Sequence, residues 1–148
     1  MTIAYRLSST KYPNNSGKGS ALHGGRWNPI GVEVIYASAS VALAAIEILA
    51  NFSVLPDDYG LTKIQIPHGL TEVVPNNKLP KDWDALTPVR ATREFGRRWA
   101  RSRRSAVLSV PSSIITAERN FLINPNHPDF RQITFSAARP FRFNPRLK

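Results

Sequence analysis

Four side chains in this sequence could take part in catalysis or ligand binding, and each also has a simpler structural explanation. Arg26 lies in the loop sequence GGRWN, Tyr36 in an alternating stretch, Glu47 in an apolar run and Ser112 after a buried stretch. A guanidinium, a carboxylate and hydroxyls can bind an anionic, hydroxylated ligand and stabilise positive charge that develops on it. The question is which elements would bring them together.

Glu47 is the most informative of the four. It belongs to VALAAIEILANF, whose composition predicts a helix over 41–52 after the cap candidates Ser38 and Ser40. No Lys or Arg lies three or four residues away on this helix. A carboxylate is rarely buried without a partner. Glu47 therefore lies either on a solvated helix edge or in a cleft, where it would meet a developing positive charge or a hydroxyl.

Arg26 lies in a tightly constrained loop. Two glycines precede it, and Trp27, Asn28 and Pro29 follow. It can pair with a surface carboxylate or stack on Trp27, as many arginines do. The glycines also allow a ligand to approach the backbone closely.

Tyr36 and Ser112 each have a structural alternative of this kind. Strict alternation places Tyr36 on the strand face of Val32 and Val34, as for a core tyrosine. Ser112 follows a buried strand and Pro111, as in a turn or a helix cap.

The elements that must position these residues indicate an α+β fold. The 148 residues suit one domain, 1–148, with no repeat or linker that divides it. Loops are predicted over 10–20 and over the proline-containing stretch 67–88. Helices are predicted over 41–52 and 91–104. Strands are predicted over 3–7, 32–37, 61–66, 106–110, 119–123, 131–135 and 140–143.

Composition and charge exclude several classes. There is no apolar run of membrane-spanning length and no signal-peptide core at the start, and we expect a cytoplasmic protein without membrane contact. The three histidines are isolated and cysteine is absent, so no metal site is expected. No phosphate-binding glycine loop is present, and no bound cofactor is expected. The net charge of +10 favours a nucleic acid, a phosphorylated small molecule or an acidic protein as partner.

Seven of the arginines lie within residues 90–104. Five of them recur at three- and four-residue steps, while Phe95 and Trp99 lie four apart and can pack inward. Such a helix can lie on DNA phosphates, or it can simply present a solvated face. No recognition-helix, RNP or zinc-finger pattern accompanies it.

Five motifs, in order, resemble the RES-domain family of toxins, which are usually encoded beside an Xre-like antitoxin. The motifs are GGRWNPIG (24–31), VIYAS (34–38), ALAAIEIL (42–49), AVLSVPSSI (106–114) and ERNFLINPNHPDF (118–130). The resemblance implies an ADP-ribosyltransferase-like mixed sheet with flanking helices and a cleft that binds NAD+. It carries over as catalytic residues Arg26, Glu47 and Ser112, and as substrate-binding residues Arg6, Tyr36, Trp27 and Asn120.

The implied activity is cleavage of the nicotinamide–ribose bond of NAD+, which is a substrate, by hydrolysis or phosphorolysis, with growth arrest as the outcome. The alternatives are ADP-ribosyl transfer to a protein and a nucleic-acid-binding module that uses residues 90–104. The resemblance also implies a cognate Xre-like antitoxin that covers the cleft and through which alone DNA is bound. It leaves a homodimer or a larger hetero-oligomer open.

Overall fold

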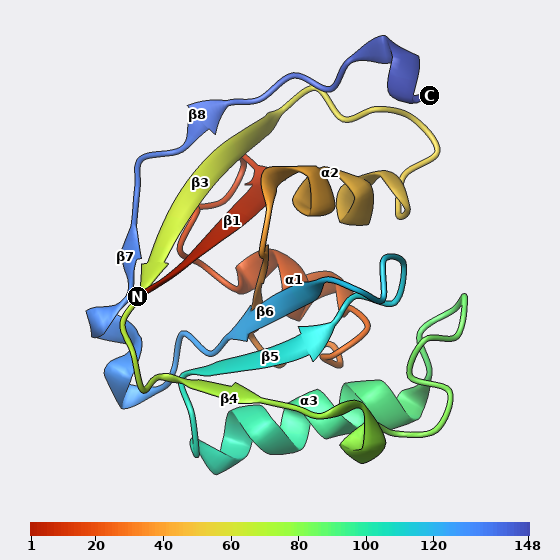
Figure 1. Ribbon diagram of the computed structural model, residues 1–148. Helices are drawn as coiled ribbons and strands as arrows, with labels where there is room; N and C mark the ends of the chain where they lie inside the picture. The colour runs from red at the N-terminus through yellow and green to blue at the C-terminus, as the bar shows by residue number, and fades with distance from the viewer.

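The computed structural model describes all residues 1–148 (Figure 1). Its strands are β1 (Thr2–Ser9), β2 (Ile35–Ser38), β3 (Tyr59–Ile66), β4 (Thr71–Val73), β5 (Val107–Pro111), β6 (Arg119–Ile123), β7 (Thr134–Phe135) and β8 (Arg139–Pro140). Its α-helices are α1 (Lys18–His23), α2 (Val41–Leu49) and α3 (Arg90–Ser102). Three short 3-10 helices cover Asn76–Lys78, Pro128–Gln132 and Pro145–Leu147. None of the helices is long and apolar enough to cross a membrane.

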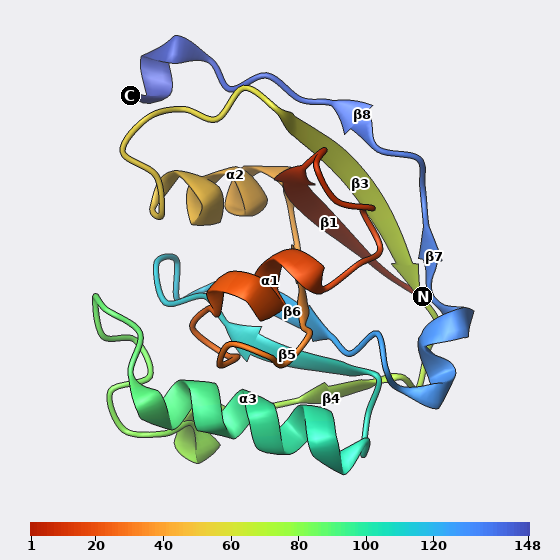
Figure 2. The ribbon, with the colours of Figure 1, turned by 180° about the vertical axis from the view of Figure 1, so that it is seen from behind.

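All eight strands belong to one mixed sheet in the order β4-β5-β6-β2-β1-β3-β7, with β8 also paired to β3. Only β4 and β5 pair in parallel. A single residue pair, Tyr5 with Ser38, joins β1 to β2. The sheet therefore has two halves, and β1 and β3 run at an angle to β5 and β6 (Figures 1 and 2).

Alternation along the strands creates two buried layers. On β2, Ile35 and Ala37 belong to a cluster of 11 buried residues. Tyr36 and Val34 pack instead in the second cluster, with residues of β5, β6 and α3. Because successive side chains of a strand point to opposite faces, Tyr36 and Ser38 share the face that α3 covers. The predicted common face of Tyr36 and Val34 is confirmed.

The two longer helices pack on different halves of the sheet. Helix α2 begins after Ser40, whose hydroxyl accepts the Leu43 N–H at 3.0 Å. It packs mainly against β1. Helix α3 buries Trp99 and half-buries Phe95, while its arginines face outward, as the spacing predicts.

The α+β class, the two predicted helices and most of the strands are confirmed, but several boundaries are wrong. Helix α2 ends at Leu49, not at 52, and the predicted loops contain α1 and β4. The predicted strand 131–135 is a 3-10 turn followed by two strand residues, and β8 covers only Arg139–Pro140. Short elements of this kind depend on pairing with distant residues, which local patterns do not encode.

Candidate active site

Glu47 is the centre of the candidate site and lies on α2, half-buried. Its Oε2 accepts a hydrogen bond from Ser112 Oγ at 3.1 Å and another from Asn120 Nδ2. Its Oε1 accepts none from the protein, and no Lys or Arg forms an ion pair with it. One oxygen is thus fixed by neutral donors, and the other accepts no hydrogen bond from the protein.

Ser112 is fully buried directly after β5. Its Oγ donates to Glu47 and accepts the backbone N–H groups of Ile114 and Ile115, at 3.1 and 3.0 Å. Its own N–H donates to the Glu118 carbonyl at 2.9 Å and closes the β5–β6 loop. The Ser112 hydroxyl therefore has two roles. It caps the turn after β5, and it orients the Glu47 carboxylate.

Asn120 reaches Glu47 from β6. The register of β2 and β6 places Ser38 opposite Asn120. Ser38 Oγ donates to Asn120 Oδ1 at 2.7 Å, so the other end of the amide, Nδ2, is directed at Glu47. We call Glu47, Ser112, Asn120 and Ser38 the Glu47 cluster.

The loop that carries Arg26 is built tightly around Asn28, which is fully buried. Asn28 Nδ2 donates to the carbonyls of Ser20 and Val32, each at 2.9 Å. Gly25 donates its N–H to the Asn28 carbonyl at 2.9 Å, and a Cβ at Gly25 would lie 2.7 Å from the Tyr36 hydroxyl. Only glycine fits this position, and the backbone of Arg26 is held firmly.

Arg26 is half-buried, and its Nη1 donates to the Trp83 carbonyl at 2.9 Å. Burial lowers the pKa of Arg26, while the negative charges of Glu47 and Asp84 act to raise it. The loop therefore holds this guanidinium within the electrostatic reach of Glu47 without an ion pair between them. Figure 1 shows α2, the β5–β6 loop and the loop before α3 on the same side of the molecule.

Tyr36 supports the same loop from β2. Its hydroxyl donates to Asn28 Oδ1 and accepts the Trp27 N–H at 3.2 Å. Burial raises the pKa of Tyr36, so its hydroxyl stays protonated. Both bonds of the hydroxyl are within the protein, which leaves the ring for any contact with a ligand.

Trp27 differs from the expectation of a substrate-binding residue. It is only 3% exposed and packs with Trp99 of α3. Its ring meets Phe95 edge-on, with the centroids 5.8 Å apart. The indole supports the loop from the core and does not offer a surface to a substrate.

Arg6 forms no hydrogen bond with the Glu47 cluster. It donates to the carbonyls of Tyr36, at 3.1 Å, and Ser16, at 3.3 Å, while its buried Nε has no partner. Burial lowers the pKa of Arg6 to about 10, and no carboxylate pairs with it. The guanidinium fills the place where β1 and β2 separate after their single pair, Tyr5 with Ser38. Its contact with a substrate stays a prediction.

The sequence analysis missed two residues of this arrangement, Ser38 and Asn28. Ser38 lies two residues beyond Tyr36 on the same strand face, so alternation could have identified it. Asn28 could be suspected only because a polar residue ends the GGRWN motif. No group of three or more acidic or histidine side chains gathers in a way that could hold a metal ion.

Comparisons with known proteins find relatives that match most of the chain. The RES domain model matches residues 3–144. A relative named "Prs ADP-ribosylating toxin" from Sphingobium sp. (strain YBL2) is 41% identical, over 89% of this chain and 85% of its own length. A "Toxin Res" from Photorhabdus laumondii is 38% identical, over 88% and 86%. Another "Toxin Res", from Yersinia enterocolitica, is 33% identical over 99% of both chains.

A solved structure supports the fold independently. A chain of the "M.tuberculosis MbcT-MbcA toxin-antitoxin complex" superposes with a TM-score of 0.72 over 95% of this chain and 84% of its own. The sequence identity is 16%, so the likeness concerns the fold alone.

Proposed function

The chain belongs to the RES domain family, and on that premise we propose that it is the toxin of a toxin–antitoxin pair that cleaves the nicotinamide–ribose bond of NAD+. The observation that carries the proposal is the Glu47 carboxylate. It is half-buried, fixed through one oxygen by neutral donors and open at the other. A carboxylate without an ion-pair partner can stabilise a cation that forms beside it.

The chemistry requires little more than this. The bond from ribose C1′ to the nicotinamide nitrogen breaks, and its electron pair neutralises the pyridinium ring. Positive charge appears at C1′, where Glu47 stabilises it or holds a ribose hydroxyl. An acceptor oxygen then adds to C1′ and gives up its proton. Nicotinamide leaves as a neutral molecule, so a site without His or Cys suffices.

The other residues have positioning and binding roles. Arg26 offers a fixed guanidinium to a phosphate or to the ribose. Ser112 and Asn120 orient Glu47 through the hydrogen bonds that they donate to its carboxylate. The Tyr36 ring offers a stacking surface next to Arg26. The pyrophosphate is the partner proposed for Arg6, whose Nε is the one buried side-chain donor without a partner.

The decisive experiment measures nicotinamide release from NAD+ by the purified chain and its Glu47→Gln variant. We expect the substitution to lower the rate by about 100- to 1,000-fold, because it removes the charge opposite the developing cation. The matched control is Asp57→Asn, the same loss of charge at an exposed residue, and it should retain full activity. An active Glu47→Gln variant would refute the assignment. Repeating the assay with and without phosphate separates hydrolysis from phosphorolysis.

A second candidate, ADP-ribosyl transfer to a protein, is favoured by the name of the Sphingobium relative. The same Glu47 cluster would serve it, with a protein side chain as acceptor in place of water or phosphate. Labelled NAD+ in a cell lysate distinguishes the two outcomes. Transfer gives a labelled protein band, and hydrolysis or phosphorolysis gives a free ADP-ribosyl product.

The proposed partner is a cognate Xre-like antitoxin that covers the Glu47 cluster. Two large apolar side chains on the segments that carry Glu47 and Ser112 are exposed: Ile46 on α2 and Ile114 in the β5–β6 loop. Such a surface suits a protein cover better than water. Binding of an antitoxin should therefore inhibit NAD+ cleavage in proportion to the complex formed.

A further inference from the structure

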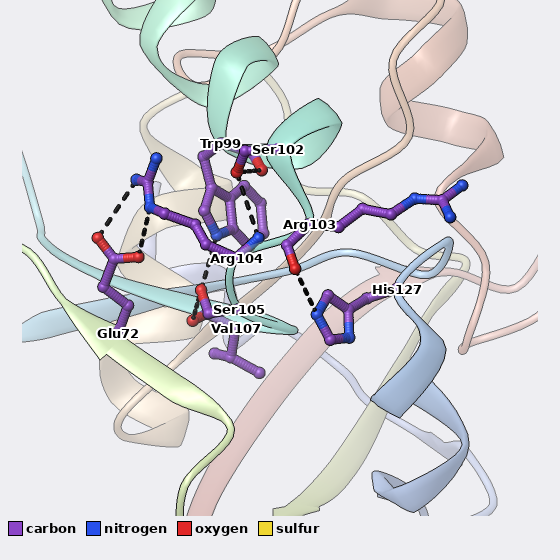
Figure 3. Close-up of polar contacts among 8 residues, drawn as sticks. All are labelled: Glu72, Trp99, Ser102, Arg103, Arg104, Ser105, Val107 and His127. Carbon is purple, nitrogen blue, oxygen red and sulfur yellow. Dashed lines mark hydrogen bonds and ion pairs between the residues drawn. The ribbon is translucent and has the colours of Figure 1, made fainter.

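Most arginines on helix α3 and directly after it have no close ion-pair partner within the protein. Arg97 pairs with Glu94 on the same helix. Arg104, just beyond the helix, donates to Glu72 of the strand β4 at 2.8 Å (Figure 3). The remaining exposed arginines are Arg90, Arg98, Arg101 and Arg103, which we call the outer arginines. Their only ion pair is a long one, from Arg98 Nε to Glu94 Oε1 at 4.0 Å.

The outer arginines form an ordered row. At 100° per residue, residues 90, 98 and 101 lie within a sector of about 80°, in which 90 and 101 are opposite the buried Trp99 and 98 is at the edge. From 90 to 101 the helix rises about 16 Å. Each strand of duplex DNA presents one phosphate per about 3.4 Å of the duplex axis, so this row would face roughly five phosphates of one strand.

An open groove runs beside the row. It has a volume of about 570 Å³ and is lined by Pro80, Arg90, Ala91, Glu94, Phe95 and Arg98. Arg90 and Arg98 lie about two helical turns apart, and Glu94, on the turn between them, is already held by Arg97. The groove therefore offers a cationic rim over an aromatic side chain.

The chemistry of this face selects among anionic partners. Its arginines are exposed, but no large apolar side chain of α3 is, whereas exposed apolar residues occur around the Glu47 cluster. Hot spots of protein interfaces are enriched in Trp, Tyr and Arg that lie in well-packed, desolvated pockets. The guanidinium groups of this face are exposed, whereas Phe95 beside them is half-buried in the groove, and such a face fits a phosphate backbone, which arginine binds through charge and hydrogen bonds.

Arg103 provides an independent observation. It ends α3 in the left-handed conformation, with φ of 54°, where glycine or asparagine is the usual residue. Its carbonyl accepts a hydrogen bond from His127 Nε2 at 2.9 Å, while its side chain extends away from the other residues drawn (Figure 3). The fold uses the backbone of this residue and not its guanidinium. A strained position that keeps an unused charged side chain is typical of a functional requirement.

We propose that the outer arginines bind the phosphate backbone of duplex DNA without reading its sequence. The proposal is independent of NAD+ cleavage, because none of the four belongs to the Glu47 cluster or to the loop that carries Arg26. It also changes the expectation that DNA is bound only through an antitoxin. The chain would add its own contacts to whatever sequence an attached partner selects.

The test measures binding of the purified chain to a fluorescent random-sequence DNA duplex over a range of salt concentrations. We expect Arg98→Gln/Arg101→Gln to weaken binding at least tenfold at 0.1 M salt. It should also reduce the slope of log K against log salt by about 1.8, which corresponds to two lost phosphate contacts. The matched control is Arg131→Gln/Arg142→Gln, which removes the same charge from exposed residues outside α3. It should bind almost as the wild type does.

Arg103→Gly separates folding from binding. Glycine relieves the left-handed backbone, so the melting temperature should stay the same or rise. DNA binding should nonetheless weaken several-fold. Equal weakening by the control pair would overturn the proposal, because only net charge would then matter. Stronger competition by polyglutamate than by unlabelled duplex would also overturn it in favour of an acidic protein partner.

Discussion

At the scale of single residues, the candidate site depends on how few groups touch Glu47. Ser112 and Asn120 fix one carboxylate oxygen, and Ser38 decides which end of the Asn120 amide points at it. All three donors are neutral, so they orient the carboxylate without cancelling its charge. The negative charge of Glu47 acts to raise the pKa of Arg26, but the guanidinium donates its hydrogen bond to the Trp83 carbonyl and not to Glu47.

Ser38→Ala should lower kcat for NAD+ cleavage by about fivefold and change KM little. The hydroxyl contributes one neutral hydrogen bond, which is worth about 1 kcal/mol, and its loss lets the Asn120 amide turn away from Glu47. Steady-state kinetics of the folded variant measure this effect. Ser38→Thr keeps the hydroxyl and should restore kcat. A change in KM alone would show that Ser38 acts on binding instead.

Arg6→Met tests whether Arg6 serves the substrate or only the fold. Since burial lowers the pKa of Arg6 to about 10, the charged guanidinium destabilises the folded state at every pH below that value. Removing it should leave the free energy of unfolding unchanged or raise it by about 1 kcal/mol, as urea titration can measure. KM for NAD+ should rise if Arg6 binds the pyrophosphate.

The pH dependence of this comparison has a definite sign. As pH rises from about 10 towards 12.5, the folded state releases the proton of Arg6 before the unfolded chain does. In this pH range the unfolded state binds more protons than the folded state does. The free energy of unfolding of the wild type should therefore rise with pH relative to that of Arg6→Met. A loss of more than about 2 kcal/mol in the variant at pH 8 would mean that the two carbonyl contacts dominate.

At the scale of elements, α3 supports the loop that presents Arg26. Trp27 packs in one buried cluster with Trp99 and Phe95, and the Trp27 carbonyl lies against Gly96. A Cβ at Gly96 would lie 1.6 Å from that carbonyl oxygen. The helix and the loop can therefore approach each other only because residue 96 has no side chain.

Gly96→Ala should destabilise the protein by about 3 kcal/mol or more, although alanine favours helices, because the methyl group must displace the loop backbone. Because that loop positions Arg26, NAD+ cleavage should fall as well. Gly19→Ala on α1 is the matched control, since its Cβ would meet Tyr12 at an ordinary 3.5 Å. Thermal unfolding compares the two variants, and equal stability would contradict the clash.

At the scale of the whole molecule, the curled sheet brings α2 and the loop before α3 to the same side from its two halves (Figures 1 and 2). Glu47 lies on α2, which packs on the half of the sheet that contains β1. The loop that carries Arg26 is supported by α3, which packs on the half that contains β5 and β6. A ligand that contacts both would link them and stabilise the folded state by mass action.

We expect NAD+ to raise the melting temperature of the inactive Glu47→Gln variant. At 100 times its dissociation constant, a ligand adds about 2.7 kcal/mol, which corresponds to roughly 5–10 °C for a chain of this size. The shift should be lost when Arg26→Gln is added, because that removes the proposed contact with phosphate or ribose. A shift that persists in the double variant would place NAD+ elsewhere.

The sequence by itself determined the local features and, through its ordered motifs, the family. The apolar run around Glu47, the alternation through Tyr36 and the glycines before Arg26 each describe a short stretch whose conformation its own residues favour. The tertiary structure alone decided which distant groups meet. Asn120 reaches Glu47 through the register of β2 with β6, and Trp83 holds Arg26 from a loop without periodicity.

The dependence on distant contacts also explains why the role expected of Trp27 differs from the one that the structure shows. Whether an indole faces a ligand or the core depends on what packs over it, and α3 covers Trp27. Whether an arginine is structural depends on a carboxylate far along the chain, as Glu72 is for Arg104. Contacts between residues far apart in sequence are set by the packing of whole elements, and no local pattern encodes them.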